Sequence, residues 1–265
     1  MNGLRTRRTG WNRKRLMDAG WRLPMILPAP LRDTPGWRVL VEERRAASEQ
    51  MALDVRLAAD AIPTLRVFLW PEAALSLGWK QMLPAWLDAP RMRRQGIEVV
   101  ERPTAGGIAF HGSDVSCAVV LPARIGLSLH AAMAMVCEAV ARGCRMWAPD
   151  ARAVTELPSQ GRVAVCLTES SSYGVYVGPR KVAGFALRRF PASWLIQGSL
   201  LVGELPEPLR QALPESVQQD LARRAVSVSA AAGRTLSPRD VAQAWALRWA
   251  DWVDELLLER LIHDL

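Results

Sequence analysis

The chain has 265 residues, half of them hydrophobic, and a formal net charge of +8. This length is enough for one large domain or two small ones with a sizeable core. No apolar run reaches the length of a membrane span, and the basic start of the chain leads into no apolar signal segment. We therefore expect a cytoplasmic protein with no membrane partner.

The first half of the chain shows both helical and strand patterns. Apolar spacing predicts a helix over residues 37–60 on the stripe Ala47, Met51, Val55 and Ala58–Ala59, ended by Pro63. Strands are expected at 65–70, 97–102, 108–110 and 115–121, the last two paired with each other. Between them we expect a turn at 71–78, a loop or short helix at 79–96 and a glycine turn at 103–107.

The second half alternates a helix, several strands and further helices. A helix is expected over 127–143, with Gly143 as its stop. Short strands are expected at 163–166, 173–177, 181–189 and 194–202. Two C-terminal helices follow, one over 216–231 stopped by Gly233, and one starting at 237–240 whose single apolar face predicts core residues Val241, Trp245, Trp249, Trp252 and Leu256. The pattern favours an α/β (α+β) fold with a mixed β-sheet flanked by helices.

The excess of basic residues has three interpretations. We expect residues 1–30 to be a basic extension and residues 31–265 to be a single domain. The extension mixes aromatic and basic residues, which would suit a nucleic acid, although nothing outside it does. A solvated tail is the plainer interpretation, and the third is that a basic surface attracts an acidic protein partner.

The four cysteines show no CxxC pairing, and the three histidines do not join them at metal-ligand spacing. The pattern argues against a disulfide framework and a metal site. The most informative spacing is that of Cys166 and Lys181, which are separated by a Ser/Gly/Tyr turn and a short strand. A thiol can carry an acyl group, and an ammonium can stabilise a carbonyl oxygen beside it. From the residues alone, the favoured interpretation of Cys166 is a small buried hydrophobic residue, and that of Lys181 is a surface lysine.

Four motifs occur in order between about residue 50 and residue 201. The first is Gln50-Met51-Ala52-Leu53-Asp54. The second consists of Pro63, Leu65, Arg66, Trp70, Pro71, Ser76, Leu77, Gly78 and Gln81. The third is ERPTAGGIAFH, residues 101–111. The fourth joins Cys166 to Arg180-Lys181-Val182, Gly184, Ala186, Arg188 and Gly198-Ser199-Leu200-Leu201. Through these motifs the chain resembles the lipoate–protein ligase and octanoyltransferase family, which is related to biotin–protein ligases.

The resemblance implies the fold of that family and protein acyl transfer. An octanoyl or lipoyl group would move from an acyl carrier protein or a lipoyl-bearing donor to a lysine of an acidic lipoyl domain. Cys166 matches the family's thioester cysteine, and Lys181 matches the lysine that contacts the acyl carbonyl. The substrate-binding positions expected with them are Arg102, Thr104, Gly106, Gly107, His111, Gly184, Ala186, Gln197 and Trp70. His111 could be a general base, an orienting group or a structural histidine. Further apolar walls are expected from Leu75, Val119 and Phe185.

Three substitutions depart from the family pattern. Glu101 replaces an arginine, Ala105 replaces a glycine and Gln197 replaces a histidine. Three functions stay open at this point. The first is a cysteine-dependent transferase that needs no cofactor, which we expect. The second is an ATP-dependent lipoate ligase that acts through lipoyl-AMP. The third is a non-catalytic protein that binds lipoyl proteins or nucleic acid.

Overall fold

The computed structural model describes residues 37–155, 164–168 and 173–263. The expected basic extension lies outside these residues, and its boundary with the following domain stays a prediction. None of the helices in the described ranges combines the length and the apolar character that crossing a bilayer requires.

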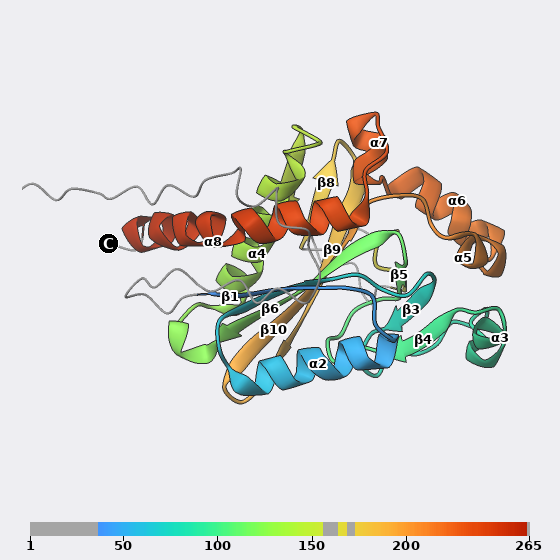
Figure 1. Cartoon of the computed structure of the whole chain (residues 1–265), viewed down its shortest axis with the longest axis horizontal. Coiled ribbons are helices and arrows are strands. Elements are labelled where there is room, and N and C mark those ends of the chain that lie inside the picture. The colour runs from blue at the N-terminus through green and yellow to red at the C-terminus, as the bar shows by residue number, and fades with distance from the viewer. Residues whose placement is uncertain (1–36, 156–163, 169–172, 264–265) are drawn as a thin grey trace, which may run out of the picture.

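The larger of two sheets is mixed, as predicted, with strand order β1-β2-β6-β10-β9-β8-β7. Its strands are β1 (Arg38–Glu42), β2 (Thr64–Phe68), β6 (Asp114–Pro122), β7 (Ala151–Val154), β8 (Gly174–Val177), β9 (Arg180–Arg189) and β10 (Ser193–Leu201). Only β1 and β2 pair in parallel. Helix α2 (Ala47–Asp60) covers one face, and α4 (Leu129–Cys144) and α8 (Pro238–His263) cover the other (Figure 1).

Helices on both faces explain the composition of β6, whose nine residues are all buried. Val119 and Leu121 point into the apolar cluster that holds α4 and α8. Ala118 and Val120 point to the opposite cluster, which holds α2. A strand that is covered on both faces needs apolar residues at successive positions, and residues 117–121 of β6 are all apolar.

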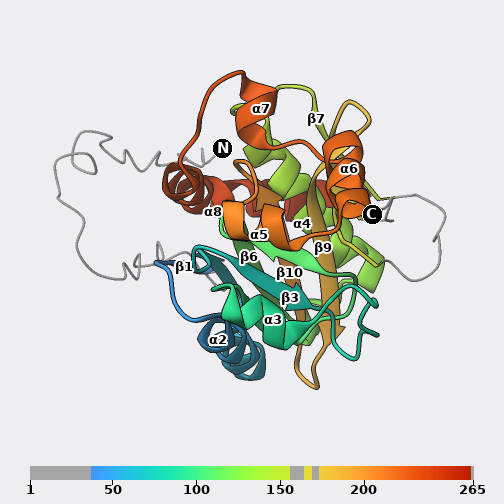
Figure 2. The same cartoon turned by 90° about the vertical axis from the view of Figure 1, so that its right-hand side faces the viewer.

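A three-stranded sheet of order β4-β3-β5 lies at one end of the molecule. It consists of β3 (Ala74–Leu77), β4 (Glu98–Glu101) and β5 (Ala109–His111), with α3 (Ala89–Arg94) beside it. Helices α5 (Glu207–Ala212) and α6 (Glu215–Arg224) lie at the same end (Figure 2). Leu75 and Phe110 from the sheet share an apolar cluster with Leu209 and Leu221 from these helices.

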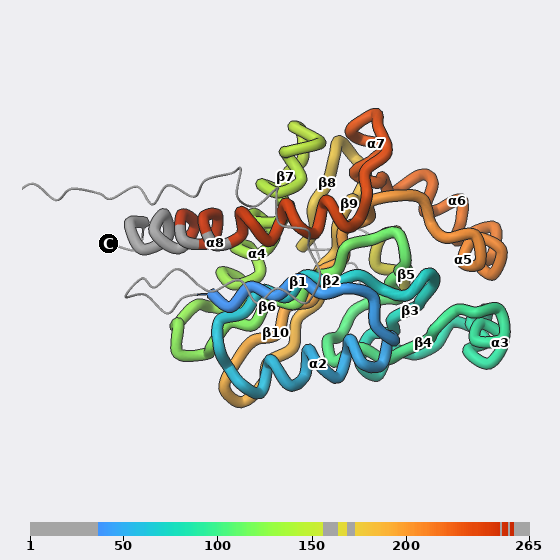
Figure 3. Tube along the Cα trace, viewed as in Figure 1, coloured from blue at the N-terminus to red at the C-terminus, as the bar shows by residue number. Residues whose placement is uncertain are grey.

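The helix predicted over 37–60 is wrong in its first part. Residues 38–42 form strand β1, which runs beside β2 (Figure 3), because Val39 and Val41 are β-branched and pair with that strand. The helix begins only at Ala47. Its buried face includes the polar Gln50 and Asp54, whereas the expected stripe residue Val55 is 41% exposed.

Three expectations for strands and turns need correction, and one strand was missed. Residues 74–77 form strand β3 and not a turn. Strands β5 and β6 do not pair, because β5 joins β3 in the small sheet. The predicted strand at 163–166 is, where it is described, one isolated bridge followed by a turn. Strand β7 was not expected.

The helix predicted over 216–231 is two helices, α6 and α7 (Val228–Ala232). They are separated where Ala225 is extended and the Val226 N–H donates to the Lys181 carbonyl at 3.0 Å. Gly233 ends α7 in a left-handed conformation, as predicted.

The other two predictions for helices concern α4 and α8. A short helical turn, Ala123–Ile125, leads from β6 towards α4. Gly143 does not end α4, which continues to Cys144. The predicted apolar face of α8 is confirmed, since its three tryptophans are buried.

Candidate active site

The Cys166 turn is attached to the small sheet by its backbone. The Cys166 N–H donates to the Ile108 carbonyl at 2.8 Å, next to the bridge between Ile108 and Val165. Val165 and Leu167, on either side of the cysteine, are buried in the cluster that includes α5 and α6. Because these neighbours anchor the turn, Cys166 itself is half-buried and lines a pocket.

Burial separates Cys166 from the other three cysteines. Cys117, Cys137 and Cys144 are buried. Burial raises the pKa of Cys117 and of Cys144 to about 12, and it raises the pKa of Cys137 as well. At neutral pH these three thiols stay protonated and weakly nucleophilic, which leaves Cys166 as the candidate nucleophile.

Lys181 and the Cys166 sulfur meet at Gly184. Lys181 is only 2% exposed, and its Nζ donates to the Cys166 carbonyl at 2.8 Å. A Cβ added to Gly184 would lie 2.4 Å from the Cys166 Sγ and 3.5 Å from the Lys181 Nζ. The thiol and the ammonium therefore lie against the same point of strand β9, and the missing side chain of Gly184 makes room for both.

Arg102 holds together the glycine loop, residues 102–107, through hydrogen bonds to its carbonyls. Its guanidinium donates to the carbonyls of Ser76 at 3.0 Å, Ala105 at 2.8 Å and Gly107 at 2.7 Å. Burial lowers the pKa of Arg102 from its ordinary value, and interaction with Cys166 acts in the opposite direction. The guanidinium thus holds the loop together and places a positive charge in the lining of the pocket that also contains Cys166.

His111 is held on both ring nitrogens. Its Nδ1 lies 2.8 Å from Asp114 Oδ2 and its Nε2 lies 2.8 Å from Ser76 Oγ. Trp70 stacks on the ring with centroids 3.8 Å apart. Burial alone would raise the pKa of Asp114, but His111, Ser199 and the backbone at Gly112 outweigh it and lower that pKa below its usual value.

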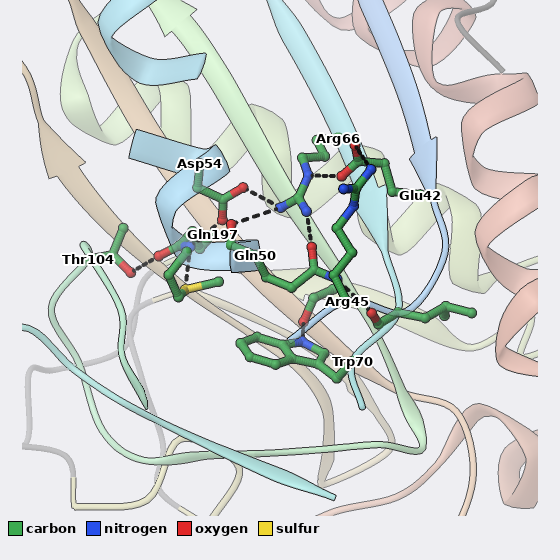
Figure 4. A network of polar contacts seen from close by, with 11 residues as sticks. Glu42, Arg45, Gln50, Asp54, Arg66, Trp70, Thr104 and Gln197 are labelled. Atoms are coloured by element: carbon green, nitrogen blue, oxygen red, sulfur yellow. Dashed lines mark hydrogen bonds and ion pairs between the residues drawn. The ribbon is translucent and has the colours of Figure 1, made fainter. Parts of the chain in front are cut away.

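Gln197 connects the glycine loop to helix α2. Its Nε2 donates to Asp54 Oδ2 at 2.6 Å, and its Oε1 accepts from Thr104 Oγ1 at 2.6 Å (Figure 4). Asp54 also accepts from Arg66, and both of these charged side chains are fully buried. Burial raises the pKa of Asp54, and Arg66 and Gln197 oppose that rise.

Most of the residues predicted from the sequence meet at one pocket. They are Cys166, Arg102, His111, Gly184, Ala186, Gln197 and Trp70. Lys181 does not line this pocket; it lines a second one and donates to the Cys166 carbonyl from there. The apolar part of the wall comes from Met51, Phe68, Trp70, Ala109, Phe185 and Ala186. Of the three further apolar walls expected, Phe185 lines this pocket, whereas Leu75 and Val119 lie in separate clusters of the core.

Three of the predicted positions do not line this pocket, although the exposed Gly106 lies next to its lining residues Arg102 and Ala186. Thr104 is fully buried under Gln197, and the Gly107 carbonyl is taken by Arg102. Gly106 has a φ of +97° and its carbonyl oxygen would lie 2.0 Å from a Cβ on Gly78. That close approach explains why a glycine stands at position 78 in the second motif.

The sequence did not single out several residues of the site. Met51, Phe68 and Cys117 line the pocket, and Asp54 supports Gln197. Met51 and Asp54 stand in the first motif, which was the available signal for them. Among residues 37–155, 164–168 and 173–263, no three His, Cys, Asp or Glu side chains are grouped so that they could hold a metal ion.

Comparisons with a protein-family model and with known sequences agree with the resemblance that the four motifs indicate. The model of the lipoyl protein ligase A/B catalytic domain matches residues 46–249. Octanoyltransferase LipM of Exiguobacterium sibiricum is 28% identical over 81% of this chain and 86% of that protein. Octanoyltransferase LipM of Kyrpidia tusciae is 30% identical, again over 81% of this chain and 86% of that protein.

Solved structures share the fold. A putative lipoate protein ligase from T. acidophilum with bound lipoic acid has a TM-score of 0.63 and 19% identity. Lipoate-protein ligase A bound with ATP has a TM-score of 0.65 and 20% identity. Each comparison covers 84% of this chain and 92% of the other.

The mixed sheet with helices on both faces, and a cysteine that lines a partly apolar pocket and is contacted by a buried lysine, define a protein of the lipoate ligase class. Because the family model matches well over half of the sequence, the chain belongs to the lipoyl protein ligase A/B catalytic-domain family.

Proposed function

We propose that this chain is an octanoyltransferase of protein lipoylation, in which Cys166 carries the acyl group as a thioester. The observation that carries the proposal is the position of Cys166, with its sulfur over Gly184 beside Lys181 at an apolar pocket. The relatives named octanoyltransferase support the choice of acyl group. In this proposal the donor is an octanoyl carrier protein, the acceptor is an acidic lipoyl domain, and the enzyme acts in the cytoplasm.

The first half-reaction forms the acyl-enzyme. The Cys166 thiolate attacks the carbonyl carbon of the donor thioester, and a new carbon–sulfur bond forms. The Lys181 ammonium and the Arg102 guanidinium stabilise the negative charge that develops near the sulfur and the carbonyl oxygen. The bond to the carrier sulfur then breaks, and the carrier leaves as a thiol after taking up a proton.

The second half-reaction transfers the acyl group to the acceptor. The neutral amine of the acceptor lysine attacks the Cys166 thioester, an amide bond forms and the Cys166 thiolate is released. The amine loses one proton, so atoms and charges balance without a cofactor. His111 has both ring nitrogens occupied by Asp114 and Ser76, which favours an orienting role for it over that of a general base.

A carboxylate at the loop argues for a transferase over an ATP-dependent ligase. Glu101 Oε2 accepts from the Lys80 N–H at 3.2 Å on an exposed part of the surface. Glu101 thus places a negative charge at the start of the glycine loop, where it would repel the phosphates of a nucleotide. Pyrophosphate release from ATP that depends on lipoate would contradict this choice.

Mass spectrometry of the intact protein after mixing with octanoyl carrier protein tests the proposal. We expect one octanoyl adduct, mapped to Cys166 and removed by hydroxylamine. The Cys166→Ala variant should form no adduct, and the control Cys137→Ala, which changes a cysteine buried in α4, should form it normally. A Cys166→Ala variant that transfers octanoyl groups at the normal rate would refute the thioester mechanism.

A further inference from the structure

The buried link between α2 and the glycine loop, Asp54–Gln197–Thr104, reaches the pocket only at Gln197 and takes no part in the acyl-transfer steps described above. It forms a directed chain of hydrogen bonds. Arg66 donates to Asp54 at 2.6 Å, Gln197 donates to Asp54 at 2.6 Å, and Thr104 donates to Gln197 at 2.6 Å. The four residues come from α2, β2, β10 and the glycine loop (Figure 4).

The direction of the chain follows from the chemistry of its members. The Asp54 carboxylate offers only acceptors, so it turns the NH₂ group of Gln197 toward itself. The Gln197 carbonyl oxygen must then face Thr104, whose hydroxyl donates to it. A reversed Gln197 amide would set its oxygen against a carboxylate oxygen. Asp54 therefore fixes which atom of Gln197 is offered to the loop.

The loop end of the chain bears directly on the pocket. Thr104 is two residues from Arg102, which lines the pocket together with Cys166, and the Thr104 carbonyl accepts the Trp79 N–H at 2.8 Å. Gln197 lines the pocket itself, and its Nε2 lies 3.4 Å from the sulfur of Met51 in the apolar wall. A shift of Thr104 would move both the loop and this wall.

A gain in the free energy of unfolding does not explain why this chain of hydrogen bonds is buried. Removing the ion pair of Asp54 and Arg66 from water costs free energy that their mutual attraction recovers only in part, and apolar side chains of similar volume are often as stable. The best-attested role of such buried polar groups is to hold the surrounding groups in a single defined arrangement.

We infer that Asp54 and Gln197 are positioning residues, which hold the glycine loop at residues 102–107 in the place that shapes the acyl pocket beside Cys166. This inference rests on the proposed function for its acyl substrate. Neither residue exchanges atoms with that substrate. Their role is to fix the width of the pocket through Thr104.

A reciprocal exchange of the two side chains tests the inference. In Asp54→Asn two NH₂ groups face each other, and in Gln197→Glu two carboxylates do. In the double variant, the amide introduced at position 54 can accept from Arg66 and donate to the carboxylate introduced at position 197, which still accepts from Thr104. The double variant thus restores each hydrogen bond of the chain, and it should restore the pocket.

The measurement uses reagents that react directly with the Cys166 thiol, so it does not require the natural acyl donor. Cys166 is treated with octyl or methyl methanethiosulfonate, each of which forms a mixed disulfide with the thiol and releases methanesulfinate. The ratio of the two rates at Cys166, followed by peptide mass spectrometry, reports how well the pocket accepts an eight-carbon chain. We expect the native protein to prefer the octyl reagent, each single variant to lose at least about tenfold of that preference, and the double variant to recover it to within about threefold.

A further variant keeps the inference testable if the Asp54→Asn or Gln197→Glu protein does not fold. Thr104→Val removes the last hydroxyl of the chain and should also lose the octyl preference. Its control is Thr64→Val, because Thr64 is likewise buried and its hydroxyl donates to the Ile62 carbonyl at 2.8 Å, away from the loop. Thr64→Val should keep the preference.

The possible outcomes separate this inference from the proposed function. Absence of an octyl preference in the native protein, or its retention in folded Asp54→Asn, Gln197→Glu and Thr104→Val proteins, would overturn the positioning role. Loss in the single variants with recovery in the double variant supports it. If octanoyl transfer were absent while this pattern held, the proposed reaction would fail and the positioning role would stand.

Discussion

Gly184 is the residue on which the position of the nucleophile depends most directly. A methyl group there would lie 2.4 Å from the Cys166 sulfur, much closer than atoms in contact allow. We expect Gly184→Ala to displace the thiol and to slow octanoyl adduct formation at least tenfold, since a misplacement of about 1 Å can cost about 10²-fold in rate. The measurement is the time course of the adduct by intact mass. The control is Gly203→Ala, whose added methyl would be 3.7 Å from the Ser113 Cβ and in ordinary contact.

Lys181 provides the second prediction at this scale. Because its ammonium is adjacent to the reacting sulfur, Lys181→Met should slow acyl-enzyme formation by about 10²- to 10³-fold, the usual effect of losing one group that stabilises an oxyanion. Arg180→Met, which changes the exposed neighbour on the same strand, should leave the rate within about twofold if only the buried lysine acts on the transition state. Equal effects of the two substitutions would argue for a general effect of charge.

The packing of α4 against α8 depends on Gly143. A Cβ there would lie 2.3 Å from Trp245 Nε1 and 3.1 Å from Trp252. Alanine is the better helix former by about 1 kcal/mol, so propensity alone predicts a more stable Gly143→Ala protein. We expect the opposite, a loss of about 1–3 kcal/mol in the free energy of unfolding, because the overpacked core must shift. Urea unfolding measures it, and a gain in stability would show that the two helices separate easily.

The same glycine illustrates how far the sequence could predict the elements. The helical spacing of apolar residues in α4 could be read from the sequence, but Gly143 resembled a helix stop. Its packing role was hidden because Trp245, which fills the space beside it, lies in a helix about a hundred residues later. Strands β9 and β10 were predicted because the apolar pattern of each strand can be read from its own consecutive residues. Strand β1 was mistaken for helix, since its partner β2 lies beyond α2.

The candidate site was readable to the extent that its residues stand in motifs. Cys166, Lys181 and the pocket residues around Gly184 were named from spacing and resemblance. Asp54 and Arg66 stood in two motifs but were not linked, because only the fold brings α2 and β2 together behind Gln197. The place of Thr104 behind the wall could not be predicted either, since it depends on which way the loop turns.

At the scale of the whole molecule, Asp114 joins the two sheets. It begins β6, and it holds His111, which ends β5. Its pKa is below the ordinary 3.8 in the folded protein, so the folded state binds fewer protons than the unfolded state in the acid range. The stability that this carboxylate contributes is therefore present above 3.8 and is lost as the pH falls through the lowered pKa.

We accordingly expect the free energy of unfolding to fall as the pH decreases below about 5 and to go on falling through the lowered pKa of Asp114, and to fall less steeply in Asp114→Asn, by up to about 1.4 kcal/mol per pH unit. Urea titrations at several pH values measure both slopes. Since Asp114→Asn is also less stable at neutral pH, the comparison is between slopes and not absolute values. Parallel curves would assign the acid sensitivity to other carboxylates.

The pairing of β6 has a consequence for the order of events during synthesis. Its residues 114–122 pair on one side with 64–68 and on the other with 193–201. A nascent chain therefore exposes one unpaired edge of β6, all nine residues of which are buried in the folded protein, until β10 has left the ribosome, and such edges invite association with other chains. Closure of contacts so distant in sequence is also slow. Enzyme activity should then emerge only after nearly the whole chain is made, and chaperones that shield apolar strands should raise its yield.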